Sequence, residues 1–135
     1  MLWLLLSRAL KPNSMKIDRN NLIHLSGKME RVVVVNGGRA WAHSVNELRD
    51  YFRMYLSGYS LREVGEYYDL TYHSVHAALT NNLVNKLSYY KPMHRENRKR
   101  LKAGEKPLTV VQFESRVTEY HGFWDESGKW VEPVH

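Results

Sequence analysis

Residues 60–79 of the chain read SLREVGEYYDLTYHSVHAAL. Ser60 and Thr71 are N-cap residues, and each precedes apolar residues that recur at helical spacing. These signals predict a short helix over 61–67 and a second helix over 72–83, joined by a turn of about three residues. The closeness of the two helices along the chain makes this pair the part of the sequence that decides the fold.

The short turn places two demands on the sequence. A small residue is needed where the helices approach each other, and Gly65 supplies it; alanine is also expected to fit there. One turn residue must take the left-handed conformation, which Asp69 can adopt at a higher cost than glycine. Apolar residues lie at the offsets that lock the pair together: Val64, Tyr68, Leu70, Val75 and Ala78.

A further helix is predicted over 45–57, directly before this pair. Ser44 and Glu47 have the spacing of a capping box, and Gly58 suits the position after a helix end. One apolar stripe follows the helical period: Val45, Leu48, Phe52 and Tyr55 or Leu56. The chain therefore contains three consecutive short helices.

Flanking segments favour strands. Asn36-Gly37 predicts a β-hairpin over 31–43, and the partial alternation over 108–119 predicts a strand. Residues 120–131 predict a second hairpin, in which two tryptophans pair across the strands or form an exposed protein-binding surface: Trp124 and Trp130.

Positive charge is concentrated in one segment. The 135 residues carry a net charge of +6, and residues 91–106 hold seven basic and two acidic side chains, which is +5 of that total. A solvated linker is one interpretation, but this density favours contact with nucleic acid. Pro92 is expected to end any helix that continues from 83, which leaves residues 94–102 as a short helix or an arm.

The segment 60–79 resembles a helix-turn-helix of the resolvase and sigma-factor region 4 type, with small-residue, turn and valine positions in this register. The resemblance covers about twenty residues, or about forty with the preceding helix. It departs from the family at Asp69, where glycine is usual. The expected fold is mainly α with short β-hairpins (α+β), a trihelical helix-turn-helix core flanked by N- and C-terminal hairpins. The expected divisions are a leader and N-terminal segment (1–30), the hairpin and helix-turn-helix core (31–90), a basic arm (91–107) and a C-terminal hairpin segment (108–135).

The resemblance implies that the helix over 72–83 lies in the major groove. The family pattern carried over assigns base reading to Tyr72, His73, His76, Ala77 and Thr80. This face has no Arg or Lys, so most of the affinity is expected from phosphate contacts. The expected phosphate-binding residues are Arg62, Thr71, Ser74, Lys91, Arg95, Arg98, Lys99, Arg100 and Lys102.

The leading functional hypothesis is a sequence-selective DNA-binding protein, a small transcriptional regulator that is not an enzyme. One alternative is an accessory or nuclease-type component of a phage or mobile-element DNA-processing system. Another is a helix-turn-helix protein that acts on a protein such as RNA polymerase. Double-stranded DNA is the expected partner, and a homodimer would give useful specificity. The apolar run over 1–6 is too short to span a bilayer, so no membrane is expected and the cytoplasm is the expected location.

No cofactor or metal is expected. The chain has no Cys, which excludes disulfides and thiolate metal sites. His73 and His76 lie three residues apart, but no carboxylate near them supports a metal site. The residue types of a histidine-asparagine-histidine nuclease are present at His94, Asn97 and His121, but their spacing does not fit such a site. The chain also shows no apparent catalytic partners for a tyrosine nucleophile.

Overall fold

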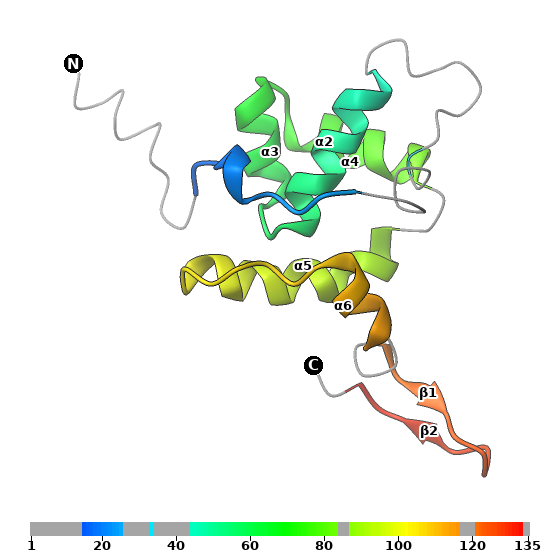
Figure 1. The fold of residues 1–135 in the computed structure, drawn as a ribbon. Helices are drawn as coiled ribbons and strands as arrows, with labels where there is room; N and C mark the ends of the chain where they lie inside the picture. The colour runs from blue at the N-terminus through cyan, green and yellow to red at the C-terminus, as the bar shows by residue number, and fades with distance from the viewer. Residues whose placement is uncertain (1–14, 26–32, 34–43, 84–86, 117–120, 134–135) are drawn as a thin grey trace.

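The fold is built mainly from helices, with a small two-stranded antiparallel sheet (Figure 1). The computed structural model describes residues 15–25, 33, 44–83, 87–116 and 121–133. The elements in chain order are η1 (Arg19–Asn21), α2 (Val45–Leu56), α3 (Leu61–Tyr68), α4 (Tyr72–Asn82), α5 (Leu87–Lys102), α6 (Val110–Ser115), β1 (Phe123–Trp124) and β2 (Trp130–Val131). The expected class, mainly α with a short hairpin, is confirmed.

The predicted helix starts are confirmed in atomic detail. The Ser44 hydroxyl accepts the Glu47 amide at 3.1 Å, and Glu47 Oε1 accepts the Ser44 amide at 3.2 Å. Ser60 and Glu63 repeat the arrangement at 3.1 and 2.8 Å. Each capping box satisfies two amides that have no partner within the helix, so these short helices begin where the sequence predicts.

Helices α2, α3 and α4 pack against one another, and α5 runs beneath them (Figure 1). The predicted stripes supply the core, although Val45 is 36% exposed and the α2 stripe therefore begins one turn later. On α5, Tyr90 and Met93 are buried, and the Tyr90 ring meets Phe52 of α2 edge-on at 4.9 Å. The fully buried apolar residues of α2, α3 and α4 are Leu48, Tyr51, Phe52, Met54, Leu56, Val64, Val75 and Leu79.

Pro92 does not end a helix. It lies inside α5, which continues for ten residues beyond it, so the expected boundary between residues 90 and 91 falls within a helix. Proline costs the helix one amide donor and crowds the preceding turn. Burial of Tyr90 and Met93 on either side of Pro92 holds the two parts of α5 against the same core.

The strand expected over 108–119 is also wrong, because residues 110–115 form α6. Thr109 and Gln112 make a third capping box, with the Gln112 side chain accepting the Thr109 amide at 2.9 Å. Val110 and Phe113, three residues apart, are buried, whereas Val111 is 78% exposed. The apolar spacing is therefore helical, and the capping pair was the overlooked signal.

The C-terminal hairpin is confirmed. Phe123 pairs with Val131 and Trp124 with Trp130 in antiparallel register. The hairpin predicted over 31–43 lies outside the described residues except for Val33, which forms an isolated bridge with Leu83. Within the described ranges, no helix combines the length and apolar character needed to cross a bilayer.

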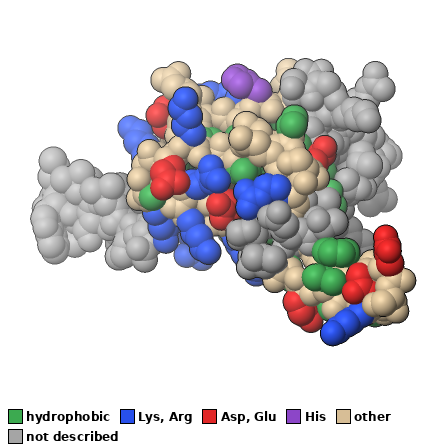
Figure 2. Space-filling model, turned by 60° about the horizontal axis from the view of Figure 1, so that its bottom comes forward, with side chains coloured by type: hydrophobic (Ala, Val, Ile, Leu, Met, Phe, Trp, Pro, Cys, Tyr) green, Lys and Arg blue, Asp and Glu red, His purple; other side chains and the backbone are tan. Residues whose placement is uncertain are grey.

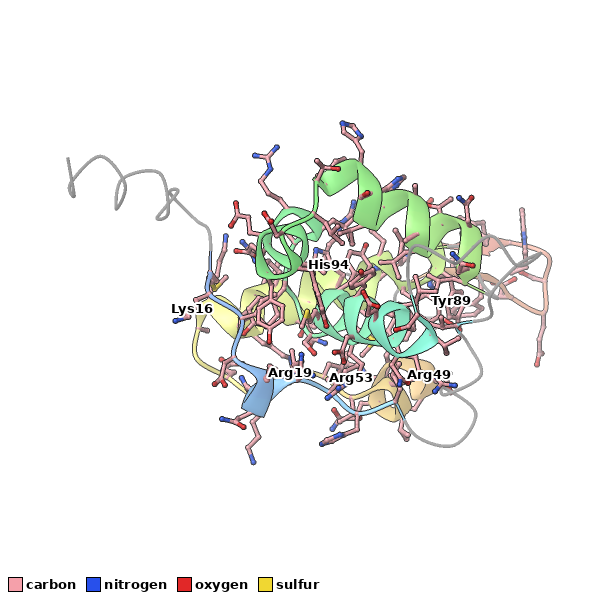
Figure 3. The ribbon with its side chains drawn as sticks, turned by 90° about the horizontal axis from the view of Figure 1, so that it is seen from above. Lys16, Arg19, Arg49, Arg53, Tyr89 and His94 are labelled. Carbon is pink, nitrogen blue, oxygen red and sulfur yellow. The ribbon has the colours of Figure 1, made fainter. Side chains whose placement is uncertain are left out.

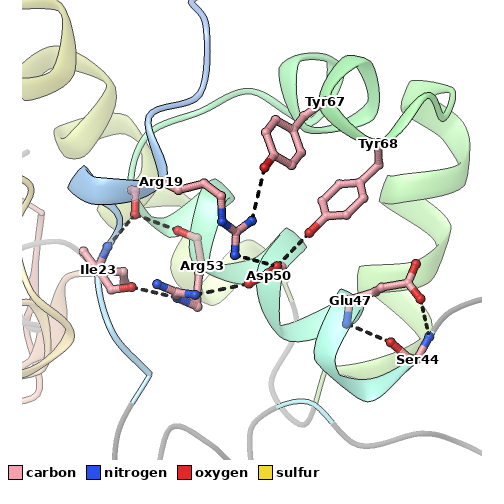
Figure 4. A network of polar contacts seen from close by, with 9 residues as sticks. Arg19, Ile23, Ser44, Glu47, Asp50, Arg53, Tyr67 and Tyr68 are labelled. Atoms are coloured by element: carbon pink, nitrogen blue, oxygen red, sulfur yellow. Dashed lines mark hydrogen bonds and ion pairs between the residues drawn. The ribbon is translucent and has the colours of Figure 1, made fainter.

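A polar network fixes the N-terminal segment to the helices (Figure 4). Asp50 of α2 accepts hydrogen bonds from Tyr68 at 2.7 Å and Arg19 at 3.0 Å, and it pairs with Arg53 at 3.1 Å. Burial acts to raise the pKa of Asp50, but these hydrogen bonds and charges outweigh it and hold the pKa below its ordinary value. Arg53 also donates to the Ile23 carbonyl at 3.0 Å, so one carboxylate and two guanidiniums connect η1 with α2 and α3.

Candidate nucleic-acid interface

The connection between α3 and α4 is a tight turn. Asp69 takes the left-handed conformation, with φ 57° and ψ 45°, as the sequence predicts. The Leu70 amide donates to the Gly65 carbonyl at 2.7 Å, which returns the chain against α3. Thr71 then caps α4, its hydroxyl accepting the Ser74 amide at 3.2 Å. These contacts fix the start of α4 relative to α3.

The outward side of α4 carries the five residues assigned to base reading, and all five are exposed: Tyr72, His73, His76, Ala77 and Thr80. Val75, Ala78 and Leu79 occupy the opposite, buried side. The Tyr72 ring lies 5.1 Å from His73 and 5.8 Å from His76, nearly parallel to the latter at 21°. This face is aromatic and polar, and α4 contains no acidic residue.

A stripe of cations runs along α5. Its members recur at helical spacing, so they share one side of the helix, and all are exposed: Lys91, Arg95, Lys99 and Lys102. No carboxylate of the described residues lies within ion-pairing distance of any of them. Figure 2, turned so that the side of α5 and α6 comes forward, shows Lys and Arg side chains spread over this part of the molecule.

The cationic stripe begins beside the outward face of α4. A hollow of about 300 Å³ separates the two helices, and its lining includes Tyr72 and His76 from α4 and Lys91 from α5. No Asp or Glu is among its lining residues, which also include Tyr55, Leu61, Leu87 and Ser88. The aromatic face and the cations therefore form one continuous surface without acidic groups at the junction.

Two of the expected phosphate-binding arginines pair with carboxylates of the protein. Arg98 forms an ion pair with Glu63 and donates to the Gly58 carbonyl at 3.2 Å. Arg100 pairs with Glu96 at 3.2 Å. Of the others outside α5, Arg62 and Thr71 are exposed and Ser74 is half-buried. The structure thus separates the basic residues of α5 into a stripe that pairs with no carboxylate of the described residues, called the free stripe below, and two arginines that pair with carboxylates.

Glu63 is the buried centre of the contact between α3 and α5. Glu63 is only 4% exposed. Its carboxylate accepts hydrogen bonds from the Ser60 amide, the Met15 amide and the Arg98 guanidinium. Burial acts to raise the pKa of Glu63, but these hydrogen bonds and the Arg98 charge lower it below the ordinary value. The sequence identified Ser60 as the N-cap of this helix but did not show that Glu63 neutralises one of the arginines of residues 91–106.

His94 joins α5 to α2 from the interior (Figure 3). Its ring stacks on Tyr55 with centroids 4.1 Å apart, and Nδ1 lies 2.8 Å from the Tyr55 carbonyl oxygen. Burial lowers the pKa of His94, and the charges of Arg98 and Arg95 act in the same direction. Burial also raises the pKa of Tyr55 to about 12. Both rings are therefore neutral at pH 7 and act as packing groups.

The residues considered for a nuclease site each bind main chain instead. Asn97 is fully buried and donates to the carbonyls of Leu56 at 2.6 Å and Leu108 at 3.0 Å. His121 lies 2.7 Å from the Tyr89 carbonyl. Among the described residues, no group of three or more His, Asp or Glu side chains could hold a metal ion. The three residues thus have structural partners in α2, α5 and the chain before α6.

Comparison with known proteins finds no matching protein family, no matching curated protein and no matching solved structure.

Proposed function

We propose that this chain is a sequence-selective DNA-binding protein in which α3 and α4 act as a helix-turn-helix of the resolvase and sigma-factor region 4 type. In this arrangement α4 enters the major groove with its N-terminal half toward the base edges. A small transcriptional regulator is the role that such a chain fits. The junction between the exposed α4 face and the α5 cations is the observation that carries the proposal.

The two parts of this surface have different tasks. Tyr72, His73 and His76 offer rings and hydrogen-bonding groups to base edges, and no carboxylate on α4 opposes the approach of a phosphate. The free stripe of α5 supplies phosphate contacts, which give affinity without direct sequence information. The four stripe residues are Lys91, Arg95, Lys99 and Lys102.

Arg98 and Arg100 have a smaller part in this proposal than their place in the sequence suggests. Both guanidiniums already bind carboxylates of the protein, so a phosphate contact would have to compete with Glu63 or Glu96. The cost is greater for Arg98, because Glu63 would be left buried without its partner. Phosphate binding is therefore assigned mainly to the stripe.

Selection of bound sequences from a random duplex pool with the purified full chain tests the proposal. We expect an enriched motif. In the double variant His73→Ala/His76→Ala, the preference for the motif base over the other bases should fall by roughly 1–3 kcal/mol at the affected positions. The double variant Lys99→Ala/Lys102→Ala should keep the motif, weaken specific and random DNA alike, and flatten the salt dependence by roughly one unit of slope per lost contact.

Arg49 and Arg116 provide a matched control for the loss of two positive charges, because they lie outside α3, α4 and α5. Arg49→Ala/Arg116→Ala should leave both the motif and the salt slope as in the wild type. Absence of any enriched sequence, together with weak binding that does not depend on salt, would contradict the proposal and favour a protein partner.

A further inference from the structure

The β1–β2 hairpin carries an exposed aromatic surface that the proposed DNA interface does not use. Trp124 is 69% exposed, and Phe123 and Trp130 are 40% and 39% exposed. The two tryptophans face each other across the strands with ring centroids 5.3 Å apart. Figure 2 shows hydrophobic side chains together on the hairpin, which extends away from the helices in Figure 1. Large exposed aromatic groups of this kind are typical of interaction sites.

Hydrogen bonds close the turn of this hairpin. The Asp125 carboxylate accepts the amides of Ser127 at 3.0 Å and Lys129 at 2.9 Å, and the Asp125 amide donates to the Lys129 carbonyl at 2.9 Å. At its base, His121 stacks on Tyr89 of α5 with ring centroids 5.0 Å apart. A fixed hairpin presents its tryptophans with little ordering cost on binding, which favours a docking role.

A groove lined by both apolar and polar residues lies elsewhere on the same chain. It has a volume of about 740 Å³ and separates the N-terminal segment from α6. Val111, 78% exposed, is the most exposed apolar residue on its wall, and Lys106 and His24 also line it. The other apolar lining residues are Leu22, Ile23, Pro107 and Val110, and the remaining polar ones are Asn20, Asn21, Thr109 and Glu114.

Charge distinguishes the partners that could meet the hairpin. Residues 121–133 carry three acidic side chains and one basic one, a net charge of −2, so the remainder of the +6 chain carries +8. A phosphate backbone would be repelled by this hairpin. The rest of a second copy carries the opposite net charge. The lining of its groove includes one cation, Lys106, and one carboxylate, Glu114, so the apolar side chains there are what Trp124 would contact.

We propose that the hairpin of one protomer inserts Trp124 into the groove between the N-terminal segment and α6 of a second copy. Reciprocal exchange of this hairpin and this groove around a two-fold axis closes the assembly as a dimer. The contact uses surfaces distinct from α4 and the α5 stripe, so both protomers keep their proposed DNA-binding faces free. The dimer does not depend on DNA and is tested without it.

Sedimentation equilibrium of the full chain between about 10 and 300 µM, the range expected for a small interface, measures the association. We expect a monomer–dimer equilibrium. Trp124→Ala and Val111→Glu should each weaken it by roughly tenfold or more, because each removes an anchor from the centre of the contact. Val45→Glu, which changes an exposed valine at the start of α2, should leave it unchanged. Circular dichroism establishes that each variant is folded.

Mixing the two weakened variants gives the sharper result. A mixed pair of Trp124→Ala and Val111→Glu chains retains one intact hairpin facing one intact groove, so the mixture should associate more strongly than either variant alone. If hairpins paired with each other, Val111→Glu would associate like the wild type. That result, or a wild type that remains monomeric throughout the concentration range, would overturn the proposal.

Discussion

The carbonyl oxygen of Leu70 lies where a side chain on Gly65 would begin. A Cβ at position 65 would be 2.5 Å from that oxygen, and the Leu70 amide also donates to the Gly65 carbonyl at 2.7 Å. Both contacts involve main chain, which cannot move aside as the end of a flexible side chain can. The expectation that alanine fits at this position is therefore wrong: the turn before α4 closes directly onto the backbone of α3.

Gly65→Ala should destabilise the protein. The better helix propensity of alanine, worth about 1 kcal/mol, is outweighed by displacement of the turn, so the free energy of unfolding should fall by roughly 1–3 kcal/mol. Urea denaturation followed by circular dichroism measures this. Arg62→Ala, at an exposed position of the same helix, should change stability by less than about 0.5 kcal/mol. A Gly65→Ala variant as stable as the wild type would show that the turn can relax.

Glycine at position 69, unlike alanine at position 65, should not lower the stability of the protein. Asp69 is exposed and has φ 57°, a conformation that costs most L-residues about 1–2 kcal/mol. Asp69→Gly should therefore be neutral to stabilising, by up to about 1 kcal/mol, and Asp69→Val should be destabilising by about 1–2 kcal/mol. Thermal melts of the three proteins give the order. A valine variant that melts with the wild type would mean that α3 and α4 can be joined without a left-handed residue.

Local signals explain which parts of the fold could be predicted. Three helix starts are marked by residues whose hydrogen bonds reach only a few positions along the chain: Ser44, Ser60 and Thr71. The backbone preference of Asp69 likewise indicates the turn. The same kind of signal was present at Thr109 and Gln112, where an apparent alternation concealed the helical spacing of the buried residues. These features depend on neighbours in sequence, which is why reading the chain alone can find them.

The course of α5 depends on contacts that are distant in sequence. Pro92 disfavours a helix locally, yet burial of Tyr90, Met93 and Asn97 against α2 and the chain before α6 sustains one. For the candidate site, sequence located the exposed α4 face and the basic segment. It could not show which basic residues are free, because the partner of Arg98 lies 35 positions earlier in the chain.

Arg98→Ala should be strongly destabilising, although the loss of an exposed charge ordinarily has little effect on folding. The change leaves the Glu63 carboxylate, whose side chain is 3% exposed, without its cation. Loss of one partner from a buried pair costs roughly 3–5 kcal/mol; because Arg98 itself is partly exposed, we expect about 2–4 kcal/mol. Denaturant unfolding at pH 7 measures this loss.

Lys99→Ala is the control for Arg98→Ala. Lys99 is exposed on the next residue of the same helix and has no carboxylate partner among the described residues, so its removal should change stability by less than about 0.5 kcal/mol. Equal stability losses at the two positions would mean that the Glu63 pair does not contribute to folding. DNA-binding experiments should accordingly neutralise Lys99 and Lys102 and keep Arg98.

The stability of the protein should fall as the pH drops below about 6.5, because His94 is half-buried beside Tyr55 and its pKa lies below the ordinary value. Above that pH the imidazole is neutral in both the folded and unfolded chains, so it adds no pH dependence. Below it the unfolded chain takes up a proton first, and stability declines until the pH reaches the lower pKa of the folded protein. Each tenfold difference in proton affinity between the two states corresponds to about 1.4 kcal/mol.

Urea unfolding at several pH values between about 5 and 7.5 resolves this decline, since the carboxylates, with ordinary pKa values near 4, contribute mainly below that range. His94→Gln cannot titrate and should remove the decline, even if it lowers stability at pH 7.5 by disturbing the ring stack on Tyr55. His73→Gln, on the exposed face of α4, should retain the wild-type slope. If the stability of His94→Gln still declines over this pH range, another group takes up the proton, and the lowered pKa of His94 does not explain the pH dependence.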